Sequence, residues 1–230
     1  MNNNYVNSFE SSKVGESTVI KNIFIWMAAG LGLTGFIAQG LFSSGLVYQI
    51  ARSGMMFPLI IGEFVLVFFI SKNIMKLKAQ TGLLLFLLYA ALNGVTLSTI
   101  FLVYTRSSIS NTFFITALLF GVMAFYGVTT KKDLTKMSTY LMMGLIGIIV
   151  ATVVNIFIGS NMLHYLISVV GVVVFTGLTA HDVQKFSRIS QQLGSDGGDS
   201  AIKVSIIGAL NLYLDFINLF LFLLRFGQRR

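Results

Sequence analysis

The fold class is decided by the stretch Leu210-Asn-Leu-Tyr-Leu-Asp-Phe-Ile-Asn-Leu-Phe-Leu-Phe-Leu-Leu224. It belongs to an apolar segment, 202–224, which is long enough to cross a bilayer because a spanning helix needs about 20 residues. A single carboxylate, Asp215, lies about 13 residues into this segment, or roughly 20 Å along a helix. So short a side chain reaches water poorly from that depth. Asp215 must therefore be buried in protein, line water, or carry a proton.

Six further apolar segments precede this one. We expect spanning helices at 22–44, 55–72, 83–104, 111–130, 139–158, 162–183 and 202–224. The chain of 230 residues is 55% hydrophobic and 10% charged, whereas soluble domains carry about 25% charged residues. Its apolar runs are continuous, which excludes a β-barrel built from short alternating strands. The sequence therefore predicts an all-α membrane protein, a bundle of seven transmembrane helices.

One membrane domain accounts for nearly the whole chain. Residues 1–21 are polar and lack the basic start and short apolar region of a signal peptide, so we expect a flexible cytosolic tail. Residues 22–226 form the expected seven-helix transmembrane domain, and 227–230 form a basic C-terminal tail. The longest connection, 191–200, is rich in Gly, Ser and Asp and predicts a flexible turn.

The basic residues predict the orientation of the chain. With the N-terminus in the cytosol, the inner side collects Lys13, Lys21, Lys72, Lys76, Lys78, Lys131, Lys132, Lys136, Lys185 and Arg188. The outer loops hold only Arg52 and Arg106, and this asymmetry is typical of membrane topology. The net charge of +8 therefore does not indicate nucleic-acid binding. Seven spans place Arg225, Arg229 and Arg230 outside, whereas a re-entrant last segment would return them to the cytosol.

Two other acids fall inside apolar segments. Asp182 lies near the cytosolic end of the sixth segment, and Glu63 lies within the second. If Asp182 and Asp215 meet in a dry site, both cannot ionise cheaply. Such a pair can share a proton as a pH switch, or bind a cation when both are ionised. The alternatives are a solvated boundary carboxylate paired with Lys185 for Asp182, and a hydrogen-bonded or protonated structural residue for Glu63.

Polar side chains near these acids are candidate modulators. His181 precedes Asp182, although neighbouring helix positions do not face each other, and His164 is expected at the membrane interface. Hydrogen bonding between helices is the default interpretation for four intramembrane residues: Asn93, Asn155, Asn211 and Asn218. Close helix packing is the expected role of another set: Gly30, Gly32, Gly35, Gly121, Gly127, Gly144 and Gly147.

The residue inventory argues against an enzyme. The chain has no Cys, which excludes thiol catalysis, disulfides and Cys-based metal sites. It has no Gly-rich phosphate loop and no nucleophile elbow. Catalytic zinc usually takes three protein ligands from His, Cys and carboxylates, and four residues could in principle form such a site: Asp182, Asp215, His164 and His181. A zinc hydrolase is thus the least favoured alternative, and we expect no cofactor.

Three stretches resemble one known family. The segment 210–225 resembles the last-helix signature of the Bax inhibitor-1 family, also called the transmembrane Bax-inhibitor-motif proteins. A sixth-helix motif, an Asp followed two residues later by Gln, is matched by Gly177-Leu-Thr-Ala-His-Asp-Val-Gln-Lys185. The loop after the fourth helix in bacterial inner-membrane members is similar to Tyr126-Gly-Val-Thr-Thr-Lys-Lys-Asp-Leu134. The resemblance covers nearly all of the chain after residue 20.

The resemblance implies a multi-pass protein of a bacterial cytoplasmic membrane whose last helix is central. Family members are described as pH-sensitive calcium leak proteins in which two Asp share a proton. These match Asp182 and Asp215, and a second-helix acid of the family matches Glu63. The family also has a second-helix Arg that pairs with an Asp in the closed state. Here that position is apolar, near Ile74, and the flanking Lys72 and Lys76 are poorer bidentate partners.

Two functions are therefore expected from different classes. The first is a pH-gated cation leak in the lipid bilayer, most favourably for Ca²⁺ as the permeant ion, with a weak site at Asp182 and Asp215. Hard cations prefer oxygen ligands, and weak binding suits permeation. The alternative is a regulatory protein that modulates a membrane-bound protease or a stress-response partner. On that alternative the polar tail and basic loops are partner surfaces.

Overall fold

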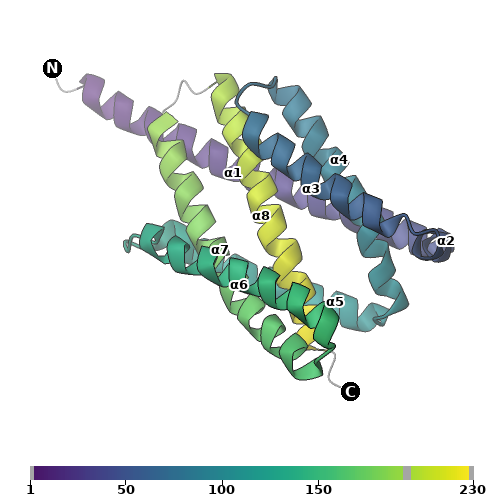
Figure 1. Cartoon of the computed structure of the whole chain (residues 1–230). Coiled ribbons are helices and arrows are strands. Elements are labelled where there is room, and N and C mark those ends of the chain that lie inside the picture. Colours follow the sequence, from purple (N-terminus) through teal and green to yellow (C-terminus); the bar gives the residue numbers. More distant parts are fainter. Residues whose placement is uncertain (1–2, 194–197, 228–230) are drawn as a thin grey trace. The chain divides into compact units, whose positions relative to one another are not determined.

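The computed structural model describes residues 3–193 and 198–227, with side chains described from residue 18 onward. Within these residues the chain is helical and has no β-strand (Figure 1). The elements are α1 (Asn3–Ser43), α2 (Leu46–Arg52), α3 (Met56–Asn73), α4 (Ala79–Leu97), the 3₁₀ turn η1 (Ser98–Leu102), α5 (Arg106–Thr129), α6 (Thr135–Ile158), α7 (Asn161–Leu193) and α8 (Gly198–Phe226). The predicted all-α fold is confirmed.

Seven helices in this part of the chain are long and apolar enough to cross a membrane. They are Thr18–Ser43, Met56–Asn73, Ala79–Leu102, Arg106–Thr129, Thr135–Ile158, Asn161–Leu193 and Gly198–Phe226. These match the seven predicted segments, and most boundaries move by only a few residues. The sixth segment differs, because α7 continues to Leu193 instead of ending near residue 183. Asp182 therefore lies well inside a helix rather than at its end.

Two features differ from the sequence-based expectations. The short helix α2, between Gly45 (φ 77°) and Gly54 (φ 72°), was not predicted. Residues 3–21, expected as a flexible tail, continue α1 as helix from Asn3. The last segment is one unbroken helix, α8, which favours a span over a re-entrant loop. The predicted flexible turn at 191–200 lies in part outside the described residues.

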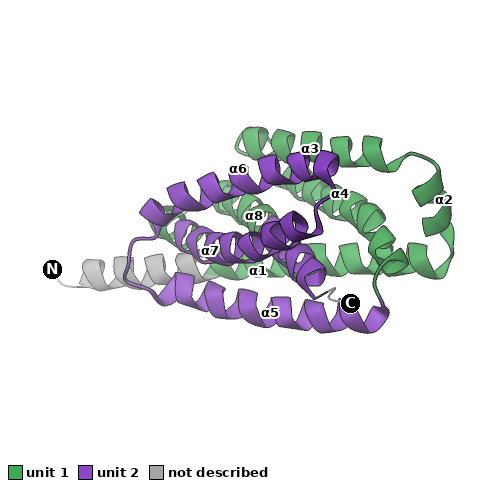
Figure 2. Ribbon diagram, turned by 60° about the horizontal axis from the view of Figure 1, so that its bottom comes forward, with its two compact units in different colours: residues 1–104, 186–213 green, residues 105–185, 214–230 purple. Residues whose placement is uncertain are grey.

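The helices group into two compact units (Figure 2). Unit 1 comprises residues 1–104 and 186–213, and unit 2 comprises residues 105–185 and 214–230. Both α7 and α8 contribute one part to each unit. In unit 1, Tyr213 of α8 is fully buried and packs against Phe86 of α4. The centroids of the two rings lie 5.8 Å apart, and the ring planes are nearly perpendicular.

The core of unit 2 is an apolar cluster between α6, α7 and α8. Its buried members are Ile148, Ile167, Val174, Phe175, Leu178, Leu219 and Phe222. The rings of Phe175 and Phe222 stack with centroids 5.7 Å apart. Of the seven spans, α8 is the most enclosed, with 67% of its apolar window buried against 6% to 39% for the others.

Only some of the glycines expected at helix contacts are packed. A Cβ atom would lie 2.6 Å from the Phe86 ring at Gly30, 2.5 Å from the Ala180 carbonyl oxygen at Gly127, and 2.8 Å from Val174 at Gly144. The remaining four have no atom within 4 Å of that position: Gly32, Gly35, Gly121 and Gly147. Close packing is thus confirmed for one glycine in each of these helices, because a small residue lets a neighbouring element approach.

Candidate functional site

Asp215 lies deep within α8 and is only 6% exposed. The buried side chains of Leu212, Phe216 and Leu219 lie within one turn of it on the same helix. The rings of Phe113 and Phe120 on α5 contact Phe216 edge-on, with centroids 5.4 and 5.5 Å away. The Oδ2 atom of Asp215 is buried and has no hydrogen-bond partner. A buried polar atom of this kind is costly unless a proton, an ion or water completes it.

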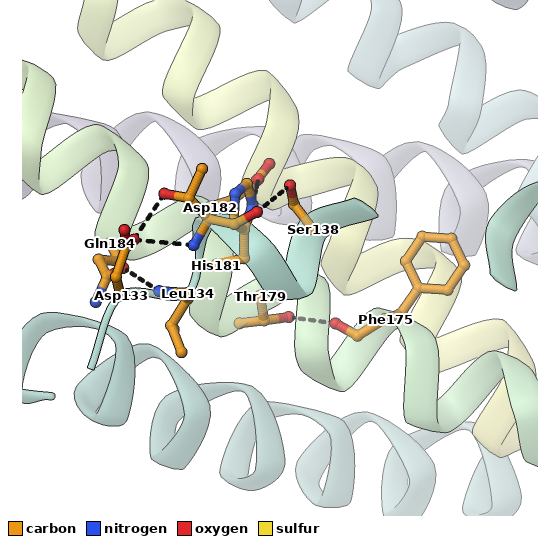
Figure 3. A network of polar contacts seen from close by, with 9 residues as sticks. Asp133, Leu134, Ser138, Phe175, Thr179, His181, Asp182 and Gln184 are labelled. Carbon is orange, nitrogen blue, oxygen red and sulfur yellow. Dashed lines mark hydrogen bonds and ion pairs between the residues drawn. The ribbon is translucent and has the colours of Figure 1, made fainter. Parts of the chain in front are cut away.

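Asp182 on α7 is the other member of the predicted pair, and its side chain is 14% exposed. Its Oδ1 atom lies 2.8 Å from Nδ1 of His181 (Figure 3). The expectation that these neighbouring side chains do not face each other was therefore wrong. Adjacent positions on a helix diverge by about 100°, but both side chains bend toward each other at the half-buried surface of α7.

The structure brings Asp182 and Asp215 within electrostatic range of each other. Asp182 and Lys185 are the charged groups whose fields act on Asp215. Asp182 and Lys185 are three residues apart on α7, so they share one side of that helix. The site therefore contains two carboxylates and one ammonium group in a poorly hydrated setting. The extension of α7 beyond residue 183 makes this approach feasible.

Gln184 lies two residues beyond Asp182 and was not singled out from the sequence. Its Oε1 accepts a hydrogen bond from the backbone N–H of Leu134 at 2.9 Å. Its Nε2 donates to the carbonyl oxygen of Lys132 at 2.8 Å. Gln184 thus binds the α5–α6 loop with both ends of its amide, and Figure 3 shows the bond to Leu134. The available signal was its place in the family motif, which does not specify a contact.

Glu63 on α3 is held by two side chains of α4 within unit 1. Its Oε1 accepts from the Thr96 hydroxyl at 2.8 Å, and its Oε2 accepts from Asn93 Nδ2 at 3.2 Å. Asn93 is 7% exposed, and its Oδ1 has no hydrogen-bond partner. The predicted interhelical hydrogen bond of Asn93 is therefore confirmed. The hydroxyl of Tyr89 lies 3.4 Å from the same Asn93 nitrogen.

A second polar chain in unit 1 joins α1, α4 and α8. The hydroxyl groups of Thr34 and Tyr213 lie 2.7 Å apart, and Thr34 Oγ1 donates to the carbonyl oxygen of Ala90 at 2.8 Å. The ring of Tyr213 meets that of Tyr89 edge-on at 5.9 Å. Neither Thr34 nor Tyr213 was predicted, because Thr commonly bonds its own helix and Tyr is unremarkable in an apolar run.

The Glu63 contacts predict opposite effects for two substitutions. Glu63→Gln should leave stability unchanged or slightly raised, because rotation of the Asn93 amide lets its orphaned Oδ1 accept from the new amide. Glu63→Leu removes both carboxylate acceptors, which leaves the Thr96 hydroxyl with only the Asn93 carbonyl oxygen at 3.0 Å and Asn93 Nδ2 with only the Tyr89 hydroxyl at 3.4 Å. Loss of the two bonds to Glu63 should cost about 1–3 kcal/mol. Thermal unfolding of the two variants in the same detergent compares them directly. Equal melting temperatures would contradict this account of the site.

The other candidate modulators lie at different kinds of positions. Lys72 is exposed, and its Nζ lies 4.6 Å from the centroid of the Phe68 ring. Lys76 is also exposed, whereas Ile74 is 3% exposed and packs toward Gly82. The apolar residue at the position of the family's Arg is therefore part of the core of unit 1.

The interhelical hydrogen bonds expected for the remaining Asn residues are not found where their contacts are described. Asn218 donates to the carbonyl oxygen of Leu214 in its own helix at 2.8 Å. Asn155 accepts from the backbone of Ser160 at 3.0 Å and closes the turn after α6. His164 is exposed in the first turn of α7, as predicted for an interfacial residue.

The four residues considered as zinc ligands do not gather into a metal site. Within residues 18–193 and 198–227, no three His, Asp or Glu side chains lie close enough to hold a metal ion together. A site made of Asp182, Asp215, His164 and His181 is thus contradicted. The two carboxylates alone would need water or backbone oxygens to bind a hard cation.

Seven apolar helices, with a buried carboxylate on α8 and partly buried carboxylates on α3 and α7, define a multi-pass helical membrane protein with acidic residues in its apolar helices. The family model described as "Inhibitor of apoptosis-promoting Bax1" matches residues 16–230. The chain therefore belongs to the Bax inhibitor-1 family, as its motifs indicated.

Relatives of similar length support this assignment. The chain is 45% identical to the inner membrane protein YbhL of Escherichia coli K12, over 97% of each chain. It is 46% identical to an uncharacterized protein of Borreliella burgdorferi, over 94% of this chain and 96% of the relative. It is 40% identical to an uncharacterized protein of Deinococcus radiodurans, over 93% of this chain and 91% of the relative.

Proposed function

We propose that this protein is a pH-sensitive cation leak of a bacterial cytoplasmic membrane, with Ca²⁺ as the favoured ion. Asp182 and Asp215 act as a proton-sharing sensor, and Glu63 attracts cations along the path. The chain carries out transport rather than enzymatic catalysis, and its N-terminus faces the cytosol. The membrane assignment rests on the seven apolar helices and on the E. coli inner membrane relative.

The observation that carries this proposal is the state of Asp215. Its carboxylate is buried in a spanning helix, one of its oxygens lacks a partner, and Asp182 lies within electrostatic range. Two neighbouring carboxylates in a dry site share one proton more readily than they ionise together. When that proton is lost, the shared hydrogen bond between the two carboxyl groups is replaced by repulsion between two negative charges, and regaining the proton reverses the change. A cation is then needed to hold the ionised pair together.

The same chemistry favours weak and transient binding of Ca²⁺. Two carboxylates supply hard oxygen ligands but too few of them for a closed calcium site, which takes six to eight. Water completes the coordination, and a permeating ion must leave as readily as it enters. The positive charge of Lys185, beside the pair, makes the local potential less negative and so further weakens the binding of a cation. The pair is thus suited to a gate rather than to calcium storage.

The direct test is Ca²⁺ entry into dye-loaded liposomes that contain the purified wild-type protein, measured between about pH 6 and pH 8. We expect flux above that of empty liposomes, with a rate that changes across this range. Absence of flux at every pH would overturn the leak. It would favour the alternative of a regulatory protein that binds a membrane-bound protease or stress-response partner. Deletion of residues 2–18 should then abolish capture of that partner.

A further inference from the structure

The α5–α6 loop of unit 2 is tied to α7 by one side chain. Gln184 accepts from Leu134 N–H at 2.9 Å and donates to Lys132 C=O at 2.8 Å. Gln184 and Leu134 are each only 6% exposed, so water competes poorly for the bond between them, whereas the bond to Lys132 is partly buried. An amide with both ends engaged in this way fixes the distance and the rotation of the loop relative to the helix. We call this pair of bonds the Gln184 clamp.

The loop itself is held at its other end by α6. Asp133 Oδ1 accepts from the backbone N–H of Thr135 at 3.0 Å and from its hydroxyl at 2.7 Å. These bonds cap the first turn of α6, where backbone N–H groups lack partners within the helix. The clamp therefore joins α7 to a structured helix start rather than to a free loop (Figure 3).

The position of the clamp on α7 relates it to Asp182. Gln184 follows Asp182 by two positions, which corresponds to about 200° around a helix. Gln184 thus holds α7 from the side nearly opposite to Asp182. One turn earlier, the Ala180 backbone lies against Gly127 of α5. The turn that carries Asp182 is consequently bracketed by two contacts with α5 and the loop that follows it.

We propose that Gln184 is a positioning residue of the sensor: the Gln184 clamp sets the rotation of α7 that presents Asp182 to Asp215. The proposal rests on the function proposed above. Without the clamp, the cytosolic part of α7 gains freedom to turn about the Ala180 contact. The distance between the two carboxylates then varies, and their sharing of a proton weakens.

Other charged groups near the pair must be held constant in any test. His181 contacts Asp182 directly, and Lys185 acts on Asp215 from the next turn of α7. Lys132 and Asp133 lie on the clamped loop, where their side chains are exposed. A useful substitution at position 184 therefore introduces no charge. Any change in titration then reports geometry rather than a new electrostatic field.

Gln184→Met keeps the length of the side chain and removes both hydrogen bonds. Gln184→Asn keeps the amide but is one methylene too short to reach both loop groups, and it serves if the Met variant does not fold. Gln192→Met is the matched control, because Gln192 is exposed on the same helix. Circular dichroism and melting temperature in detergent establish that each full-length variant is folded.

Two measurements then separate the clamp from the leak. The first is the pH profile of Ca²⁺ flux in liposomes. The second is infrared titration of the carboxylic-acid C=O band, assigned to the pair by its loss in Asp215→Asn, which needs no ion flow. We expect both Gln184 variants to shift the midpoint of each titration, with the control at the wild-type value.

The outcomes are distinguishable. If the wild type shows no flux but the Gln184 variants shift the infrared midpoint relative to the wild type, the positioning role is supported and the leak is overturned. Folded Gln184 variants that titrate as wild type would overturn the positioning role, whatever the flux. A loss of flux amplitude with an unchanged midpoint would also overturn it, because that result describes a purely structural residue. A wild-type protein whose pair shows no titrating band would overturn both proposals.

Discussion

Asp215→Asn is expected to abolish the pH dependence of Ca²⁺ flux while leaving the fold intact. Asn has nearly the same shape as Asp but cannot exchange a proton, so the pair is reduced to the single carboxylate of Asp182. The unpartnered Oδ2 of Asp215 makes this substitution mild for stability, because no hydrogen bond to that atom is lost. The measurement is dye-reported flux in liposomes between about pH 6 and pH 8, for the variant and the wild type.

A matched carboxylate on the same helix provides the control. Asp199 lies in the first turn of α8, its side chain is 62% exposed, and it pairs with Lys203 at 2.6 Å. The carboxylate is exposed although the Lys203 side chain is only 13% exposed, and Asp199 lies 16 positions before Asp215 on the helix. Asp199→Asn should therefore keep the wild-type pH profile. If both variants behave like wild type, Asp215 is a structural residue and the proposed sensor is wrong.

Gly127→Ala is expected to produce the largest loss of stability among small substitutions. The added Cβ would lie 2.5 Å from the carbonyl oxygen of Ala180 and 3.2 Å from its Cα. These are backbone atoms, so no side chain can rotate away, and α5 must separate from α7. Overpacking of this kind costs about 1–3 kcal/mol. The check is the melting temperature in detergent, followed by circular dichroism of the helices.

Gly121 on the same helix makes the comparison decisive. No atom lies within 4 Å of the position where its Cβ would be. Gly121→Ala should be neutral or stabilising, because Ala favours a helix over Gly by about 1 kcal/mol. The two variants should therefore shift the melting temperature in opposite directions. A similar decrease in both would mean that α5 and α7 do not meet at Gly127 and Ala180.

The number and order of spanning helices were predictable from the sequence. Length and hydrophobicity are properties of a continuous segment, and a bilayer requires that each segment satisfy its own backbone hydrogen bonds. The predicted helix boundaries were wrong in parts of the chain that need not cross the bilayer. Hydropathy falls at residue 183, but α7 continues to Leu193 because polar residues also form helix outside an apolar layer. The helix α2 between two left-handed glycines has only 7 residues, too few for the apolar run by which spanning helices were predicted.

The candidate site was predictable only in part. Asp215, Asp182 and Glu63 were found because charge in an apolar segment is rare and costly. Their partners were not found, because a partner depends on which helix lies opposite and at what rotation. Thr34 meets Tyr213 across 179 positions of sequence, and Gln184 reaches a loop 50 positions earlier. Nothing in the local sequence marks either contact.

The two glycines of α5 show the boundary between the two kinds of information. By itself the sequence determined that Gly121 and Gly127 lie in a membrane helix, that three acids lie in apolar segments, and that the motifs match one family. Only the tertiary structure decided that a Cβ at Gly127 would meet the Ala180 backbone while a Cβ at Gly121 would meet no neighbouring element within 4 Å. The physical reason is that hydrophobicity acts along one helix, whereas packing and hydrogen bonding depend on atoms that distant segments bring within a few ångströms.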